Sequence, residues 1–224
     1  MSGISPQVLD FFKALSINNN REWFGTHKSE FKTLESEVKI FMKKAEHVLQ
    51  GHDKIEKAKL FRIYRDVRFS KNKTPYKTHF GMAFYREKPA LRGGYYIHIE
   101  PNNSFLGVGF WGPSPKDLYR IRKELEADAD ELREIINKPT FKKYWGILKG
   151  DELKTAPKGF NKTHANIDLI KKKQYTFYKE ITDEELVSDD FSVLLEDHFK
   201  HIRPYFDYMS NLLTTNLNGE SLLS

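Results

Sequence analysis

The stretch that decides the fold is residues 80–111, FGMAFYREKPALRGGYYIHIEPNNSFLGVGFW. Bulky apolar residues alternate with smaller or polar ones in three short runs, and a period of two residues predicts β-strands. The runs are Phe80–Tyr85, Tyr95–Glu100 and Phe105–Trp111. Proline, glycine and asparagine occupy the intervening positions, which is typical of turns. Three strands joined by short turns predict an antiparallel meander.

Helical spacing of apolar residues predicts helices on both sides of this meander. Ser5-Pro6 and Asn20 mark two helix starts before residue 50, and Ser114-Pro115 marks another that runs to about residue 137. We further expect a loop-rich stretch over 139–163, a short helix over 165–172, a strand over 175–181, and a last helix over 189–213 that kinks at Pro204. The predicted fold class is α+β, a mostly antiparallel sheet packed with several helices and with helical N- and C-terminal segments.

The length of 224 residues fits a single domain over residues 1–224. Its expected parts are an N-terminal helical segment at about 5–50, a sheet core at about 59–111, and further helices and a strand at about 114–213.

The chain has no cysteine, which excludes disulfides, thiolate metal sites and a cysteine nucleophile. We find no signal-peptide pattern and no apolar run of the roughly 20 residues that cross a bilayer, so we expect a cytoplasmic protein without a membrane partner.

The positive charge of the chain is concentrated in one segment. The net charge is +6, and residues 59–79 hold seven basic residues against Asp66 alone. The remainder of the chain is therefore neutral, which is unlike a protein that coats nucleic acid with an evenly basic surface. The basic composition thus indicates a local site.

This basic segment contains the candidate ligand-binding residues. We expect a strand over about 59–66, extending at most to residue 69. In it Asp66 accepts hydrogen bonds from Arg62 or Arg68, while Arg65 faces the apolar side and needs a partner. Several converging guanidinium groups match the oxygens of phosphate or carboxylate. The candidates are Arg62, Arg65, Asp66, Arg68, Asn72, Lys73, Tyr76 and Lys77.

Three functions remain open for this segment. The first is a binding or enzymatic site for a phosphate-bearing or other anionic small molecule. The second is nucleic-acid binding, because Tyr64, Phe69 and Tyr76 interleave with the basic residues. The third is a non-enzymatic interaction module in which the cluster serves as an internal salt-bridge network.

The catalytic residues are not determined by these patterns. Asp66, His98 and Glu100 are the candidates, since His98 and Glu100 share one face of a predicted strand. With no further histidine or carboxylate nearby in sequence, we interpret that pair as a hydrogen-bonded pair and expect no metal site. No nucleophile–base–orienter set and no cofactor motif is visible, and the oligomeric state is not indicated. Gly107 and Gly109 lie in a predicted strand, where they would allow another segment to approach the sheet.

The basic segment also carries a family resemblance. Its pattern is Arg-x-x-Arg-Asp-x-Arg-Phe-x-x-Asn-Lys-x-x-Tyr, from Arg62 to Tyr76. With Asn-Asn-Arg-x-Trp-Phe at 19–24 and Pro-Lys-Gly-Phe at 157–160, it resembles the mainly bacterial family catalogued as domain of unknown function 2461. The resemblance covers nearly the whole chain and implies no particular reaction.

Overall fold

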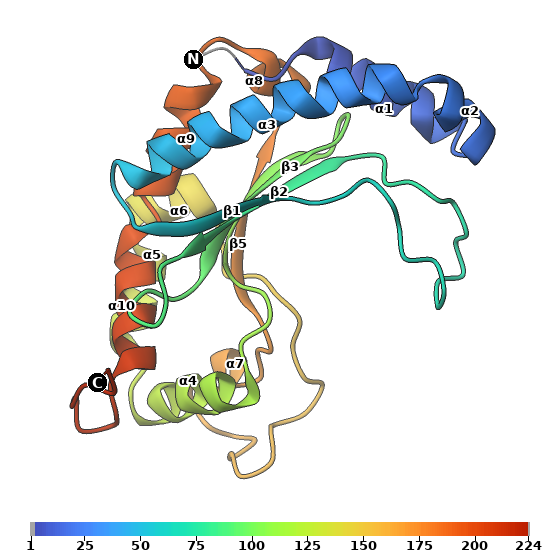
Figure 1. Ribbon diagram of the computed structural model, residues 1–224. Coiled ribbons are helices and arrows are strands. Elements are labelled where there is room, and N and C mark those ends of the chain that lie inside the picture. The colour runs from blue at the N-terminus through green and yellow to red at the C-terminus, as the bar shows by residue number, and fades with distance from the viewer. Residues whose placement is uncertain (1–2, 224) are drawn as a thin grey trace. The chain divides into compact units, whose positions relative to one another are not determined.

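The computed structural model describes residues 3–223, which form ten helices and five strands (Figure 1). The helices are α1 (Pro6–Ile17), α2 (Arg21–Thr26), α3 (Lys28–Gln50), α4 (Pro115–Ala127), α5 (Asp130–Asn137), α6 (Pro139–Trp145), α7 (Ile167–Ile170), α8 (Asp183–Val187), α9 (Phe191–Lys200) and α10 (Arg203–Thr214). The strands are β1 (Ile55–Leu60), β2 (Phe80–Arg86), β3 (Gly94–Ile99), β4 (Ser104–Phe110) and β5 (Tyr175–Ile181).

The strands form one antiparallel sheet in the order β1-β2-β3-β4-β5. Every strand therefore pairs with its neighbours in the sequence, and the α+β fold class predicted from the alternating pattern is confirmed. The connection from β4 to β5 is long and contains α4 to α7. No helix among residues 3–223 is both long and apolar enough to span a membrane.

The chain divides into two compact units, each made of three segments. The first contains Met1–Phe84, Tyr96–Leu106 and Glu180–Asp197, and the second contains Tyr85–Tyr95, Gly107–Lys179 and His198–Ser224. The expectation of a single domain stays a prediction, and each unit is described by itself.

In the first unit, helices α1 and α3 cover one face of the sheet. The alternation predicted for β2 buries Phe80, Met82 and Phe84, whose side chains share a face. The ring of Phe80 packs against Phe12 of α1 at 4.9 Å and Phe31 of α3 at 5.7 Å between centroids. Residues of the opposite parity, such as Gly81 and Tyr96, therefore lie on the other face, where the candidate site is found.

In the second unit, α10 packs on α4 and α5, and aromatic rings fill the core. Tyr205 of α10 lies 5.1 Å from Phe177 of β5 between ring centroids and donates a hydrogen bond to the Tyr175 carbonyl. Gly109 has a φ of 126°, and a Cβ atom there would collide with the backbone of β5 at Tyr175. The interpretation that a glycine in this strand allows another segment to approach is confirmed.

The boundaries of several helices differ from those predicted. The predicted helix after Asn20 is two helices, and Asn20 accepts a hydrogen bond from the Trp23 N–H as expected of its cap. Helices α4 and α5 replace one helix, and α6 lies inside the stretch expected to be loop-rich. The last helix is interrupted before Arg203, because Pro204 sits in the first turn of α10, where its missing N–H costs no hydrogen bond.

The strand expected over 59–66 is also placed wrongly. Strand β1 ends at Leu60, and residues 61–79 form a long loop with one isolated bridge between Tyr64 and Tyr76. A regular ladder cannot continue through residue 75, because Pro75 accepts a hydrogen bond from the Arg65 N–H but has no N–H to donate in return. The polar strand β1 lies at the sheet edge, where charged side chains remain hydrated.

Candidate functional site

The basic loop, residues 61–79, connects β1 to β2 and extends beyond the end of the sheet (Figure 1). Its base is fixed by Asn19, whose amide exchanges hydrogen bonds of 3.0 and 3.1 Å with the backbone of Tyr76. The Tyr76 ring is buried and stacks on Phe24 at 4.0 Å between centroids. Burial, followed by the neighbouring Tyr64, raises the pKa of Tyr76. Tyr76 therefore anchors the basic loop.

Some cations of the basic loop are bonded within it. Arg68 forms a two-pronged pair with Asp66, with Nε–Oδ1 at 3.0 Å and Nη2–Oδ2 at 2.7 Å. This confirms that Asp66 accepts from Arg68, and the Arg68 hydrogen bonds hold the pKa of Asp66 below its ordinary value. Arg65 is half-buried and donates to the Thr74 carbonyl at 3.1 Å and to its hydroxyl, so it has the partner that its position demands.

The loop tip is closed by two further residues. Lys73 donates to the Val67 carbonyl at 2.9 Å, and Asn72 accepts hydrogen bonds from the backbone and the hydroxyl of Thr74. We call Arg65, Arg68 and Lys73 the bonded cations. Only Arg68 among them forms an ion pair, while Arg65 and Lys73 donate to carbonyl or hydroxyl oxygens, so the salt-bridge network stays a prediction.

Three other cations, at residues 59, 62 and 77, lie near one another without such partners. The ammonium groups of Lys59 and Lys77 lie 5.0 and 5.6 Å from the centre of the Phe61 ring. Burial lowers the pKa of Lys77, and the charges of Arg62 and Lys59 lower it further. Among residues 3–223, no side-chain hydrogen bond or ion pair joins any of these three cations to another residue. We call Lys59, Arg62 and Lys77 the unpaired cations; Arg62 acts on Asp66 only through its charge.

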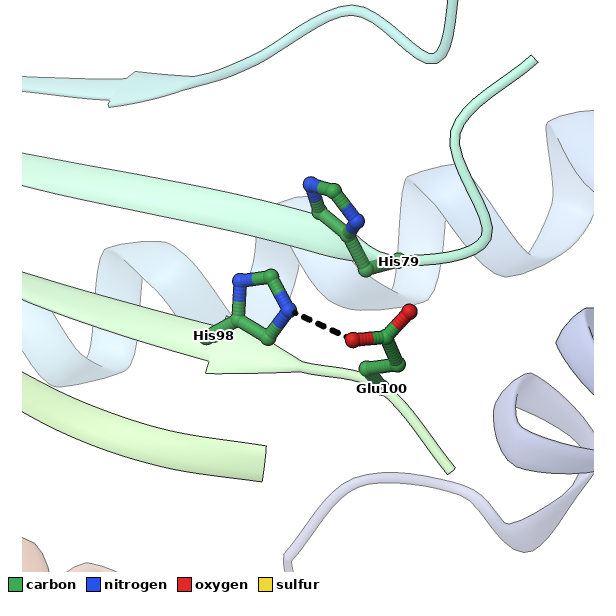
Figure 2. A group of neighbouring side chains, drawn as sticks. All are labelled: His79, His98 and Glu100. Atoms are coloured by element: carbon green, nitrogen blue, oxygen red, sulfur yellow. Dashed lines mark hydrogen bonds and ion pairs between the residues drawn. The ribbon is translucent and has the colours of Figure 1, made fainter. Parts of the chain in front are cut away.

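A second group of polar side chains lies where the basic loop enters the sheet. His79 precedes β2, while His98 and Glu100 lie at the end of β3, and Figure 2 shows the His98 ring joined to the Glu100 carboxylate by a hydrogen bond, with His79 beside them. One ligand atom from each residue lies within 4.8 Å of the other two. His98 Nε2 is 3.2 Å from Glu100 Oε2, and the two imidazole rings are 4.2 Å apart between centroids. We call these three residues the histidine–glutamate cluster.

Neighbouring residues hold the histidine–glutamate cluster in place. The hydroxyl of Tyr96 lies 3.3 Å from His98 Nδ1, and Phe105 stacks on the His98 ring at 4.6 Å. Thr78 and Asn103 donate hydrogen bonds of 2.9 and 2.7 Å to the Glu100 carboxylate.

The pKa directions favour neutral rings beside a charged carboxylate. Burial, followed by the charge of His98, lowers the pKa of His79 to about 4. Burial also lowers the pKa of His98. Burial opposes ionisation of Glu100, but hydrogen bonds from Asn103, His98 and Thr78 outweigh it and lower the pKa of Glu100. Neutral imidazoles and an ionised carboxylate are the forms that bind metal ions.

Sequence reasoning selected His98 and Glu100 as a pair but missed His79. The hydrogen bond between His98 and Glu100 is present, as interpreted. An end-to-end antiparallel pairing of the predicted strands 80–85 and 95–100 would set residue 80, not residue 79, opposite Glu100, so the sequence carried no signal that joins His79 to the pair. Asp66, the other candidate catalytic residue, is exposed and pairs with Arg68.

Comparison with known proteins gives a family. A family model described as conserved hypothetical protein (DUF2461) matches residues 7–208. The chain belongs to this family. No curated protein and no solved structure matches the chain. The DUF2461 match spans both groups of side chains described above but names no reaction, so their function is argued from geometry.

Proposed function

We propose that the chain binds a phosphate-bearing or other multi-oxygen anion at the unpaired cations, Lys59, Arg62 and Lys77. One observation carries this proposal. Burial, followed by the charges of Arg62 and Lys59, lowers the pKa of Lys77, and none of the three cations forms an ion pair with a carboxylate in the described chain. Charges of one sign that are held together favour an anion between them.

The bonded cations make a weaker anion site. Arg65 and Lys73 donate to loop oxygens, and Arg68 already binds a carboxylate through two of its nitrogens. An incoming anion would have to displace these partners. The unpaired cations lose no such contact, so each new charge-assisted hydrogen bond contributes its full value.

The experiment is a titration with inorganic phosphate, pyrophosphate and nucleotides, followed by calorimetry and by the melting temperature. A ligand that binds only the folded chain raises the melting temperature by mass action. Arg62→Ala and Lys77→Met each remove one charge, and Met keeps an unbranched stem over Phe61. Each substitution should weaken binding by roughly ten- to a hundredfold, because a hydrogen bond to a charged group contributes about 1.5–3 kcal/mol.

The matched control is Lys71→Ala. Lys71 is an exposed cation of the same loop, so the substitution removes the same charge without touching the unpaired cations. Its effect on affinity should stay within about twofold, as expected of a screened surface charge. Equal losses in Lys71→Ala and Lys77→Met, or no binding by any of the three anion classes, would refute the proposed site.

A second candidate function is binding of single-stranded nucleic acid. It is favoured by the exposed rings among the basic residues, because Phe69 is 97% exposed and Tyr64 is 50% exposed. Bases stack on exposed rings while cations follow the phosphates. A short RNA should then bind with an affinity that falls steeply with salt, and Phe69→Ala should reduce it by about 1–3 kcal/mol. A salt-independent signal, or none at low salt, excludes this candidate.

A further inference from the structure

The histidine–glutamate cluster has the donor set of a transition-metal site. It offers two imidazole nitrogens and one carboxylate oxygen, with ligand atoms within 4.8 Å of one another. Around an ion with bonds of about 2.0–2.2 Å, tetrahedral ligand atoms lie roughly 3.4 Å apart. The separation of 3.2 Å between His98 Nε2 and Glu100 Oε2 already fits such an edge. The ligand atom of His79 lies within 4.8 Å of both the others.

The surroundings also fit a metal site. Metal-binding histidines use one ring nitrogen for the ion and donate the other N–H to a nearby oxygen. Tyr96 supplies that oxygen, since its hydroxyl lies 3.3 Å from His98 Nδ1. Thr78 donates to Oε1 of Glu100 and Asn103 donates to Oε2, so both oxygens of the carboxylate are oriented.

The alternative is a hydrogen bond between His98 and Glu100 alone. It accounts for the 3.2 Å contact but gives no reason for His79 to be there. Two imidazoles, one half-buried and one buried, lie 4.2 Å apart between ring centroids beside one carboxylate, with an angle of 36° between the rings (Figure 2). A single cation would satisfy the lone pairs of all three groups.

We propose that His79, His98 and Glu100 bind one divalent transition-metal ion, with Zn²⁺ as the best-fitting ion. The donor set of nitrogen and oxygen suits Zn²⁺, Fe²⁺ or Co²⁺ rather than Ca²⁺ or Mg²⁺, which prefer oxygen alone. Three protein ligands leave at least one coordination position for water or a ligand oxygen, as in catalytic rather than structural zinc sites. The metal site stands independently of the anion site at Lys59, Arg62 and Lys77.

The test uses the full chain without a polyhistidine tag, stripped of metal with a chelator. Co²⁺ is added first, because its visible absorption reports both stoichiometry and geometry, and Zn²⁺ is then added as a competitor. We expect one Co²⁺ per chain with the spectrum of a four- or five-coordinate ion. Zn²⁺ should displace it, since N/O sites bind Zn²⁺ more tightly than Co²⁺.

Two substitutions and one control locate the site. His79→Ala and Glu100→Gln should each lower the affinity for Zn²⁺ at least tenfold, because even residues that only support ligands change affinity by 10–100-fold. His47→Ala removes an exposed histidine of α3 and should leave the affinity unchanged. The melting temperature of each metal-free variant shows whether it folds.

A measurement on the wild-type chain covers the case in which a variant fails to fold. Zn²⁺ should shift the ring ¹⁵N signals of His79 and His98 and leave those of His47 in place. No binding, equal affinity in His79→Ala and His47→Ala, or shifts confined to other histidines would overturn the proposal. Anion binding that is lost in Lys77→Met while Zn²⁺ still binds would show that the two sites are separate.

Discussion

The bonded and the unpaired cations lie in one stretch of 21 residues, yet their environments are opposite. Arg65, Arg68 and Lys73 donate to oxygens of the basic loop. Lys59 and Lys77 lie over the Phe61 ring, and burial, followed by the charges of Arg62 and Lys59, lowers the pKa of Lys77. The same residue types therefore stabilise a loop in one place and form a candidate ligand site in the other. The difference arises from which oxygens each side chain can reach.

The largest effect on the free energy of unfolding should come from Asn19, which fixes the base of the basic loop. Asn19→Ala removes two hydrogen bonds to the backbone of buried Tyr76 and leaves its N–H and carbonyl without partners. The free energy of unfolding should fall by about 2–3 kcal/mol, measured by urea denaturation. Asn72→Ala, at the exposed loop tip, serves as the control and should cost less than half as much. Equal losses of unfolding free energy in the two variants would mean that the Asn19 amide does not fix the base of the basic loop.

Two of the bonded cations, Arg65 and Arg68, should differ in how much they contribute to the free energy of unfolding. Arg65→Ala removes a half-buried guanidinium that donates to Thr74, so we expect a loss of about 1 kcal/mol in unfolding free energy. Arg68→Ala removes the same charge from a pair whose side chains are 77% and 50% exposed. Its stability should match the wild type within error, because exposed ion pairs are screened. The reverse order would contradict the assignment of Arg65 as the structural cation.

The pH dependence of His79 tests the cluster beside the unpaired cations. The pKa of His79 falls from an ordinary 6.5 to about 4, through burial and then the charges of His98 and Lys77, against the opposing effect of Glu100. Between these values the unfolded chain binds more protons, so the stability contributed by neutral His79 is lost as the pH falls from about 6.5 to 4. An NMR titration of metal-free protein should show His79 titrating well below the ordinary value of 6.5. A midpoint near 6.5 would show that the ring is hydrated.

The smallest effect should be an increase in the free energy of unfolding. Lys77→Met removes one of three like charges while keeping contact with Phe61, so the unfolding free energy should rise by about 0.2–0.5 kcal/mol. The pKa of His79 should rise in the same variant, since the charge of Lys77 lowers it. Lys71→Ala should change neither quantity. A loss of stability in Lys77→Met would show that its charge has a partner in the protein.

Residues 80–111 illustrate how much of the fold could be predicted. The alternation and the turn residues predicted β2, β3 and β4 to within about one residue, because a half-buried strand imposes its period on its own sequence. The edge strand β1 was predicted too late in the sequence, at 59–66, since Glu56, Lys57 and Lys59 face water and carry no apolar period. Of the candidate ligand residues, Arg62 and Lys77 fall among the unpaired cations, whereas Lys59 was counted only in the charge of the segment.

By itself, the sequence determined the α+β class, the meander, the family and the location of the excess charge, because composition and periodicity are local properties of the chain. Only the tertiary structure decided which cations find oxygens within the loop and which do not. It alone placed His79 beside His98 and Glu100, residues 19 and 21 positions away. Both outcomes depend on distances of a few ångströms between segments that sequence spacing does not encode, and charge pairing and metal ligation act only at such distances.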